Sequence, residues 1–279
     1  MQQPLIKQGW LRAILFLTAY LLLMLFTATV LSKLSASVSL PDEPTLWGGI
    51  LIQLILGILL VLIFRKWMDR SSIKSLGLPL KQHAKEAITG FVTGIFICHL
   101  IAVVLWLMQL LEWMPDDASI LSLLPSFLLL ALVAFTEELV FRGYLLNNLM
   151  QSMNEKTALF TSAFIFAAAH SFNPEFNLTA FFNILLAGLL LGINYIFTRN
   201  LWFGILLHLS WNFVQGPVLG FKVSGLELPS LLEQNLRGSI LLTGDEFGLE
   251  ASWLTAIVFG IAIPVFYLLF QKKYGTPPA

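Results

Sequence analysis

Long apolar segments occupy most of this chain and limit what it can fold into. The hydrocarbon core of a bilayer is about 30 Å thick, so a helix that crosses it needs about 20 mainly apolar residues. About eight segments reach or approach this length, at residues 11–31, 46–64, 87–111, 121–146, 157–171, 178–197, 201–220 and 251–270. Charged residues form only 11% of the sequence, against about 25% in soluble domains. The sequence therefore predicts an all-α, polytopic membrane helix bundle of about eight transmembrane helices.

Lysine and arginine are distributed unevenly between the loops. Twelve of the 16 basic residues lie in the N-terminal segment, in the loop at 65–86 and in alternate later loops. The opposite side has only Lys33, Lys222 and Arg237, and its loop at 112–120 carries only the acidic residues Glu112, Asp116 and Asp117. Because cytoplasmic loops hold the excess of positive charge, we expect both termini in the cytoplasm.

The first apolar segment has a second interpretation. Lys7 and Arg12 precede it and the small residues 35–37 follow it, as in a cleaved signal peptide. Its apolar run of about 19 residues exceeds the usual 7–15, so we expect a retained transmembrane helix. The formal net charge of +0 gives no sign of a nucleic-acid partner. We expect membrane lipid as the surroundings, with the basic loop at 65–86 solvated rather than bound to anionic lipid.

The longest break between spans lies at residues 221–250. It contains a weakly amphipathic leucine pattern around Leu226 to Leu236, which predicts an extracytoplasmic loop or a surface helix. Several other residues have an expected structural role: the single cysteine Cys98, the histidines His83 and His99, and the small-residue pairs Gly90 with Gly94 and Gly188 with Gly192. The glycine spacing favours internal helix packing over dimerisation and leaves the oligomeric state open.

A first polar cluster, formed by Glu137, Glu138 and Arg142, interrupts the fourth apolar segment. Ionisable groups at membrane depth are costly and rare, so each is a candidate functional residue. On a helix Glu138 and Arg142 are four residues apart, and we expect them to neutralise each other as a buried pair. Glu137 lies about 100° around the helix from Glu138. Its carboxylate is a candidate general base; alternatively, all three side chains form one buried ionic network.

Two further pairs repeat the four-residue spacing, Phe166 with His170 and His208 with Asn212. Each pair shares one face of a helix. His208 and Asn212 could bind substrate, line an ion path or donate hydrogen bonds to a developing oxyanion. At a rise of 1.5 Å per residue, Glu137, His170, His208 and Asn212 lie at similar depths, about 11–20 Å from the cytoplasmic helix ends. This coincidence indicates one shared, water-accessible site.

Three motifs occur in a fixed order: Glu-Glu-x-x-x-Arg at 137–142, Phe-x-x-x-His at 166–170 and His-x-x-x-Asn at 208–212. Together with the stretch 198–208, they resemble the CAAX-type intramembrane protease (CPBP) family, which includes type II CAAX prenyl endopeptidases and bacteriocin-processing or immunity (Abi) relatives. The resemblance covers about residues 134–215. It implies one membrane domain over 1–279 with a catalytic core at about 121–220. Residues 1–120 and 221–279 then supply accessory transmembrane helices and loops.

The resemblance also implies roles for individual residues. Glu137 would activate a water molecule, His170 would position that water, and His208 and Asn212 would stabilise the oxyanion. Glu138, Arg142 and Phe166 would support this geometry. The implied activity is that of a membrane-embedded endopeptidase, which hydrolyses a peptide bond of a membrane-associated peptide or protein, lipidated or not. We expect such a protein in a bacterial inner or plasma membrane.

Other functions remain open on the sequence alone. Two histidines and a glutamate around a water also describe a catalytic zinc site, formed by Glu137, His170 and His208. The His-Glu-x-x-His signature is absent, so we expect no metal cofactor. A non-proteolytic immunity or scaffold protein would keep the polar residues for helix packing alone. A proton-coupled transporter is a weaker alternative, because the sequence shows no inverted repeat and no pair of interrupted helices.

Overall fold

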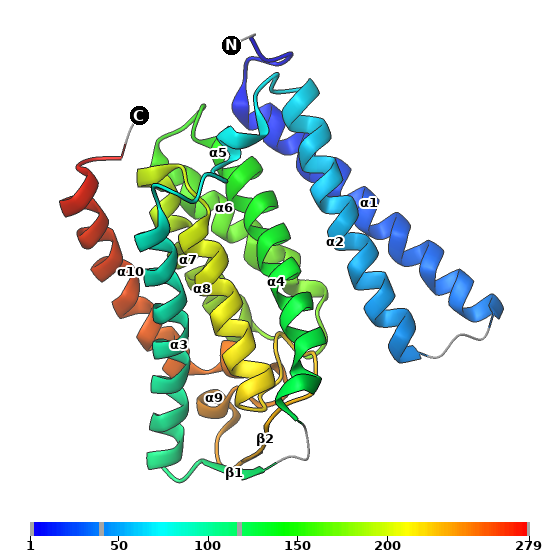
Figure 1. Cartoon of the computed structure of the whole chain (residues 1–279), viewed down its shortest axis with the longest axis vertical. Coiled ribbons are helices and arrows are strands. Elements are labelled where there is room, and N and C mark those ends of the chain that lie inside the picture. Colours follow the sequence, from blue (N-terminus) through cyan, green and yellow to red (C-terminus); the bar gives the residue numbers. More distant parts are fainter. Residues whose placement is uncertain (1–2, 39–41, 116–118, 278–279) are drawn as a thin grey trace.

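The computed structural model describes residues 3–38, 42–115 and 119–277, and most of them are helical (Figure 1). The main helices are α1 (Gly9–Val38), α2 (Asp42–Trp67), α3 (Ala84–Leu107), α4 (Leu124–Glu138), α6 (Glu155–Ala169), α7 (Leu178–Thr198), α8 (Trp202–Phe213) and α10 (Trp253–Tyr274). Shorter elements are η1 (Ile73–Leu76), β1 (Leu111–Pro115), η2 (Ile120–Leu123), η3 (Leu139–Leu146), α5 (Asn147–Leu149), η4 (His170–Phe172), η5 (Val214–Val218), β2 (Leu232–Leu236), α9 (Ile240–Thr243), η6 (Asp245–Phe247) and η7 (Leu249–Ala251).

Within the described residues, six helical segments are long and apolar enough to cross a membrane: Gly9–Leu34, Trp47–Trp67, Ala84–Leu107, Ile120–Leu149, Leu178–Thr198 and Trp253–Tyr274. The expected spans at 157–171 and 201–220 are the shorter helices α6, of 15 residues, and α8, of 12 residues. Helix α8 packs against α3, α4 and α7, and α6 packs against α7. The prediction of an all-α polytopic membrane bundle is confirmed, with six helical segments of spanning length among the described residues.

Short polar residues determine where two of these helices begin. The Asn154 side chain accepts a hydrogen bond from the backbone N–H of Thr157 and caps α6, and Asn177 caps α7 by accepting from Ala180. Such caps satisfy backbone donors that have no partner within the helix. Because α6 ends at Ala169 and α7 starts at Leu178, the intervening turn places His170 at the end of a helix rather than in its middle.

Both termini lie at the same end of the bundle (Figure 1), as the prediction of a common side requires. At the opposite end, β1 pairs antiparallel with β2, with Leu111 opposite Leu236. The surface-helix alternative for the leucine pattern is therefore wrong over Leu232–Leu236, because the extended β1 segment offers these residues a partner strand. Asp116 and Asp117, expected in the acidic loop beside β1, lie outside the described residues.

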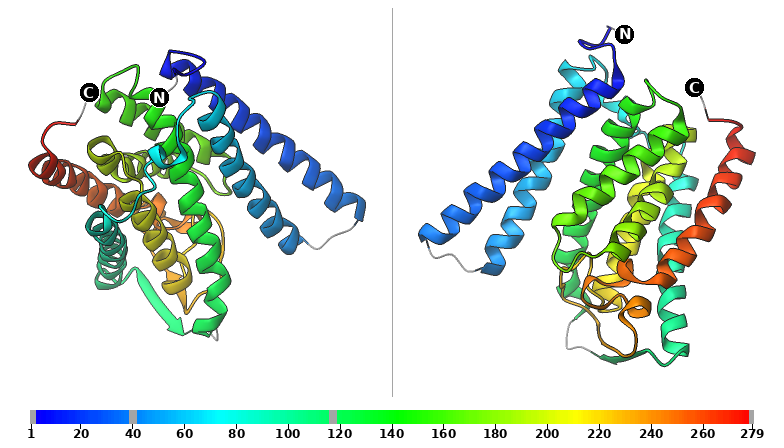
Figure 2. Two further views of the ribbon diagram at one scale, coloured as in Figure 1. Left: turned by 45° about the horizontal axis from the view of Figure 1, so that its top comes forward. Right: turned by 180° about the vertical axis from the view of Figure 1, so that it is seen from behind.

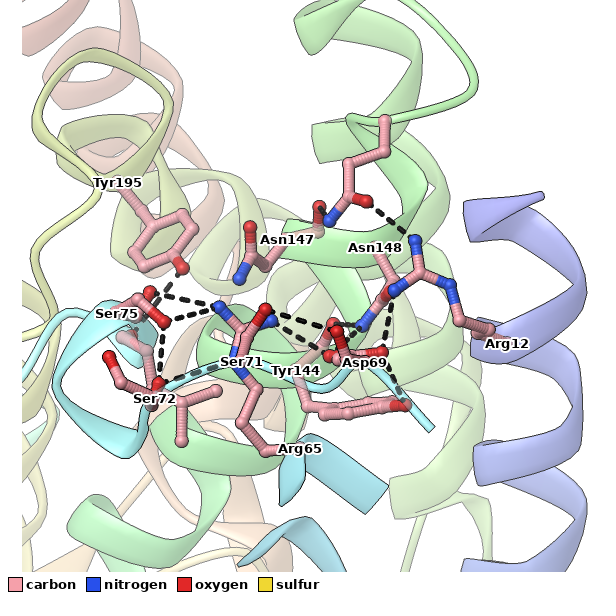
Figure 3. A network of polar contacts seen from close by, with 12 residues as sticks. Arg12, Arg65, Asp69, Ser71, Ser72, Ser75, Tyr144, Asn147, Asn148 and Tyr195 are labelled. Carbon is pink, nitrogen blue, oxygen red and sulfur yellow. Dashed lines mark hydrogen bonds and ion pairs between the residues drawn. The ribbon is translucent and has the colours of Figure 1, made fainter. Parts of the chain in front are cut away.

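Helices α1 and α2 form a hairpin that leans away from α4 toward the end opposite the termini (Figures 1 and 2). A buried polar network fastens the base of this hairpin to the bundle (Figure 3). The Asp69 carboxylate accepts hydrogen bonds from Arg12 at 2.6 Å, Arg65 at 2.8 Å, Tyr144 at 3.2 Å and Asn148 at 3.4 Å. These donors come from α1, α2, η3 and α5, so one aspartate joins four elements.

The glycine pairs serve contacts within the chain, as expected. A Cβ atom at Gly90 would lie 2.2 Å from the carbonyl oxygen of Phe203, and one at Gly188 would lie 2.9 Å from Cα of Ala163. Only glycine allows α3 to approach α8, and α7 to approach α6, this closely. Cys98 is fully buried, in agreement with its expected packing role.

Candidate active site

The expected ion pair lies at the junction of α4 and η3. Arg142 Nη1 donates to Glu138 Oε1 at 2.7 Å, and both side chains are buried. A second guanidinium nitrogen donates to the carbonyl oxygen of Gly188 at 3.0 Å, and the guanidinium carbon lies 4.4 Å from the centre of the Phe166 ring. A cation over an aromatic face is favourable. Arg142 thus ties α4 to α6 and α7, and the predicted Glu138–Arg142 pair is present.

The helix changes from α to π geometry directly after Glu138, over Leu139–Leu146. A second π segment, Val214–Val218, begins two residues after Asn212. Such widened turns are rare in proteins, and a large share of those that do occur lie at functional sites. Neither segment was predicted from the sequence. Gly216 and Pro217 are a visible signal for the second, and the first contains a single glycine, Gly143.

Glu137 lies between the two motif histidines. Its Oε2 atom is 3.9 Å from His170 Nε2 and 3.8 Å from His208 Nε2. This oxygen is buried and has no hydrogen-bond partner among the described residues. Both separations are too long for a direct hydrogen bond, but a single water molecule can bridge such a distance. The structure therefore brings together three side chains that are 33 and 38 residues apart in sequence.

Each imidazole is oriented through its other nitrogen. His170 Nδ1 lies 2.7 Å from the carbonyl oxygen of Phe166, so a proton on Nδ1 is donated there and Nε2 faces Glu137. His208 Nδ1 lies 3.5 Å from Glu138 Oε1. The Phe166 ring packs against both imidazoles, with centroids 4.5 and 6.3 Å away. Phe166 and Glu138 thus hold the two rings, as support residues would.

Asn212 lies one helical turn beyond His208 and is buried. Its carboxamide makes no hydrogen bond to another described residue, which leaves it available to a bound group. His170, His208 and Asn212 line one cavity of about 40 Å³. All four predicted catalytic residues are therefore in one place, with Glu137 against the two histidines that border the cavity.

Two polar residues of the same cavity were missed by the sequence analysis. Ser224 and Glu250 line it, although both belong to the segment that follows α8. Glu250 is 9% exposed, and its Oε2 accepts hydrogen bonds from the backbone N–H of Ser224 at 2.7 Å and from its hydroxyl at 3.1 Å. Burial raises the pKa of the Glu250 carboxyl group above its ordinary value. The available signal was an acidic residue immediately before an apolar span.

The remaining histidines make other contacts. His83 Nδ1 lies 3.9 Å from a Glu86 carboxylate oxygen, and His99 Nδ1 lies 2.9 Å from the carbonyl oxygen of Ile95. Among the residues that the structure describes, no group of three or more His, Cys, Asp or Glu side chains is arranged to hold a metal ion. In a tetrahedral zinc site, bonds of about 2.0–2.1 Å would place the Glu137 oxygen and a histidine nitrogen about 3.3 Å apart. The observed separations of 3.9 and 3.8 Å are wider.

Comparison with known proteins gives one match. Residues 119–214 match the family model described as type II CAAX prenyl endopeptidase Rce1-like. No curated protein and no solved structure matches the chain. The matched segment contains all seven residues of the three motifs, whereas Ser224 and Glu250 follow it. Residues 119–214 are therefore similar to the CAAX protease family over the segment that carries the three motifs.

Proposed function

We propose that this protein is an intramembrane endopeptidase that hydrolyses a peptide bond by means of a water molecule activated by Glu137. One observation carries the proposal: a buried carboxylate oxygen without a partner faces two imidazole nitrogens at 3.9 and 3.8 Å. A buried, unpartnered carboxylate is costly unless it serves a function. A water molecule between these three groups would satisfy all of them and would be correctly placed to lose a proton.

The reaction follows from this arrangement. Glu137 takes a proton from the water, and the water oxygen attacks the carbonyl carbon of the scissile peptide bond. His170 holds the water through Nε2, while His208 and Asn212 donate hydrogen bonds to the oxyanion that forms. Glu137 then gives the proton to the leaving nitrogen as the carbon–nitrogen bond breaks. No covalent enzyme intermediate is needed.

The supporting residues keep the reacting groups in place. Glu138 faces His208 Nδ1, and Arg142 neutralises Glu138 and packs on Phe166. We propose no metal cofactor, because the Glu137 oxygen lies farther from both histidine nitrogens than zinc coordination requires. If zinc did take part, Glu137, His170 and His208 would hold it. The substrate would be a membrane-associated peptide or protein, lipidated or not, in a bacterial inner or plasma membrane.

The direct test is mass-spectrometric mapping of new protein N-termini in host membranes. Membranes would contain the wild-type chain, Glu137→Gln or Glu233→Gln at matched expression; Glu233 is an exposed carboxylate on β2 and serves as the control. We expect a set of termini that disappears with Glu137→Gln and persists with Glu233→Gln. Identical maps from all three would contradict the proposal and favour the immunity or scaffold alternative.

A further inference from the structure

The cavity beside the candidate active site has two polar sides of different origin. His170, His208 and Asn212 come from the segment that matches the protease family, whereas Ser224 and Glu250 come from the segment after it. The rest of the lining is apolar and aromatic: Phe166, Ile184, Ala187, Leu190, Leu191, Leu207, Trp211 and Phe259. Glu250 is therefore the acidic group in the largely apolar lining that it shares with His170, His208 and Asn212.

Glu250 is held in place from several directions. Ser224 donates two hydrogen bonds to its carboxylate, from the backbone N–H and from the hydroxyl. Asn183 of α7 donates to the backbone carbonyl oxygens of Glu250 and Ser252, at 2.8 and 2.7 Å. Because both its backbone and its side chain are anchored, the Glu250 carboxyl group has a fixed position at the edge of the cavity.

The size and chemistry of the cavity favour water. A volume of about 40 Å³ corresponds to about three water molecules at 10–15 Å³ each, and water occupies a cavity when polar groups supply two to four hydrogen bonds. Glu250, Ser224, Asn212 and the two histidines supply such groups. An apolar residue in place of Glu250 would remove the only carboxyl group among the lining residues and leave the two Ser224 donors without their partner, so fewer polar groups would remain to order water there.

We propose that Glu250 is a positioning residue that, with Ser224, holds a small group of water molecules in this cavity against His170, His208 and Asn212. The inference rests on the proposed function, because those waters would supply the hydrolytic water. In an apolar bundle, water must reach a site that the bilayer shields, so an anchored polar group beside that site is required. Glu250 and His170 line the same cavity, so water held by Glu250 lies beside the group proposed to position the hydrolytic water.

The state of the carboxyl group agrees with this role. Its pKa is raised by burial, so the protonated form is more populated than for an exposed glutamate. The protonated carboxyl group donates one hydrogen bond and also accepts, whereas the ionised form only accepts, so either form can order water. Glutamine keeps both capacities at nearly the same volume, whereas leucine keeps only the volume.

The test compares Glu250→Gln, Glu250→Leu and the control Glu246→Gln. Glu246 pairs with Lys222 in the same segment and does not line the cavity. The first measurement is a high-resolution structure of each protein in lipid nanodiscs. We expect ordered water in the cavity of the wild type, Glu250→Gln and Glu246→Gln, and none in Glu250→Leu. A dry wild-type cavity, or water that persists in Glu250→Leu, would overturn the proposal.

The second measurement is the cleavage rate, with a protein found by the N-terminus mapping as substrate. We expect kcat to fall about tenfold or more in Glu250→Leu, with KM changed less than about twofold, since a lost hydrogen bond to the reacting water is worth about that factor. Glu250→Gln should restore most of kcat. An unchanged kcat in a dry Glu250→Leu would show that these waters do not serve the reaction and would overturn the positioning role. If no cleavage depends on Glu137, the proposed function fails. The structures in nanodiscs then still test separately whether Glu250 orders water in the cavity.

Discussion

Replacing Arg142 by methionine separates the stability of the candidate site from its chemistry. Arg142 neutralises Glu138 at 2.7 Å, donates to the carbonyl oxygen of Gly188 and packs on Phe166. Both charged side chains are 1% exposed, so Arg142→Met leaves an uncompensated buried carboxylate. Removing one partner of such a pair costs about 3–5 kcal/mol. We expect a loss of this size in the free energy of unfolding, measured by denaturant titration in detergent micelles.

The double variant Glu138→Gln with Arg142→Met gives the decisive comparison. Removing both charges of a buried pair is often nearly neutral, so most of the lost stability should return. Activity should not return, because the contact between Glu138 and His208 Nδ1 at 3.5 Å loses its charge. The prediction for the pair would be refuted if Arg142→Met cost less than about 1 kcal/mol, or if the double variant were no more stable than the single one. Wild-type cleavage by a restored double variant would refute the role of Glu138 in orienting His208.

Three further outcomes are expected. In Gly204→Ala, the added Cβ atom would lie 2.6 Å from Glu138 Oε2. The free energy of unfolding should fall by about 1–3 kcal/mol, and the cleavage rate should fall as well. In the control Gly260→Ala, the added Cβ atom meets nothing within 4 Å, so the cleavage rate should not change. Asp69→Leu should lower the free energy of unfolding by about 3–5 kcal/mol, because it leaves the buried charges of Arg12 and Arg65 unpaired. When Arg12→Met and Arg65→Met are added to Asp69→Leu, the same denaturant titration should recover most of that loss. Chelation should leave cleavage intact, and stoichiometric zinc that is lost together with activity would contradict the absence of a metal cofactor.

The bundle and the ion pair were predictable because both depend on local spacing. Runs of apolar residues determine where long helices form, and a four-residue interval makes Glu138 and Arg142 neighbours on any helix. Depth along each helix also placed Glu137 and His208 at a common level, as the 3.8 Å approach of their side chains requires. These inferences need only helix geometry and the thickness of a bilayer.

The remaining features depend on contacts between distant segments. The β1–β2 pairing joins residues more than a hundred positions apart, so the leucine pattern at 226–236 gave no reliable sign of a strand. The π geometry after Glu138 could not be predicted from its own sequence, which is that of an apolar helix apart from Arg142 and Gly143. Asp69 could be read as one charge in a basic loop, whereas it is the buried centre of the network in Figure 3.

Glu250 shows how the two parts of the chain combine in one site. The segment that matches the family model, 119–214, supplies the groups proposed to carry out hydrolysis. The segment after it supplies two polar residues of the cavity lining, Ser224 and Glu250. Since a hydrolase within a membrane needs water as much as it needs a base, variation in this second segment would change the reaction rate without altering any motif residue. Similarity to the family over residues 119–214 therefore leaves this second segment undescribed, and the variants at Glu250 measure what it contributes.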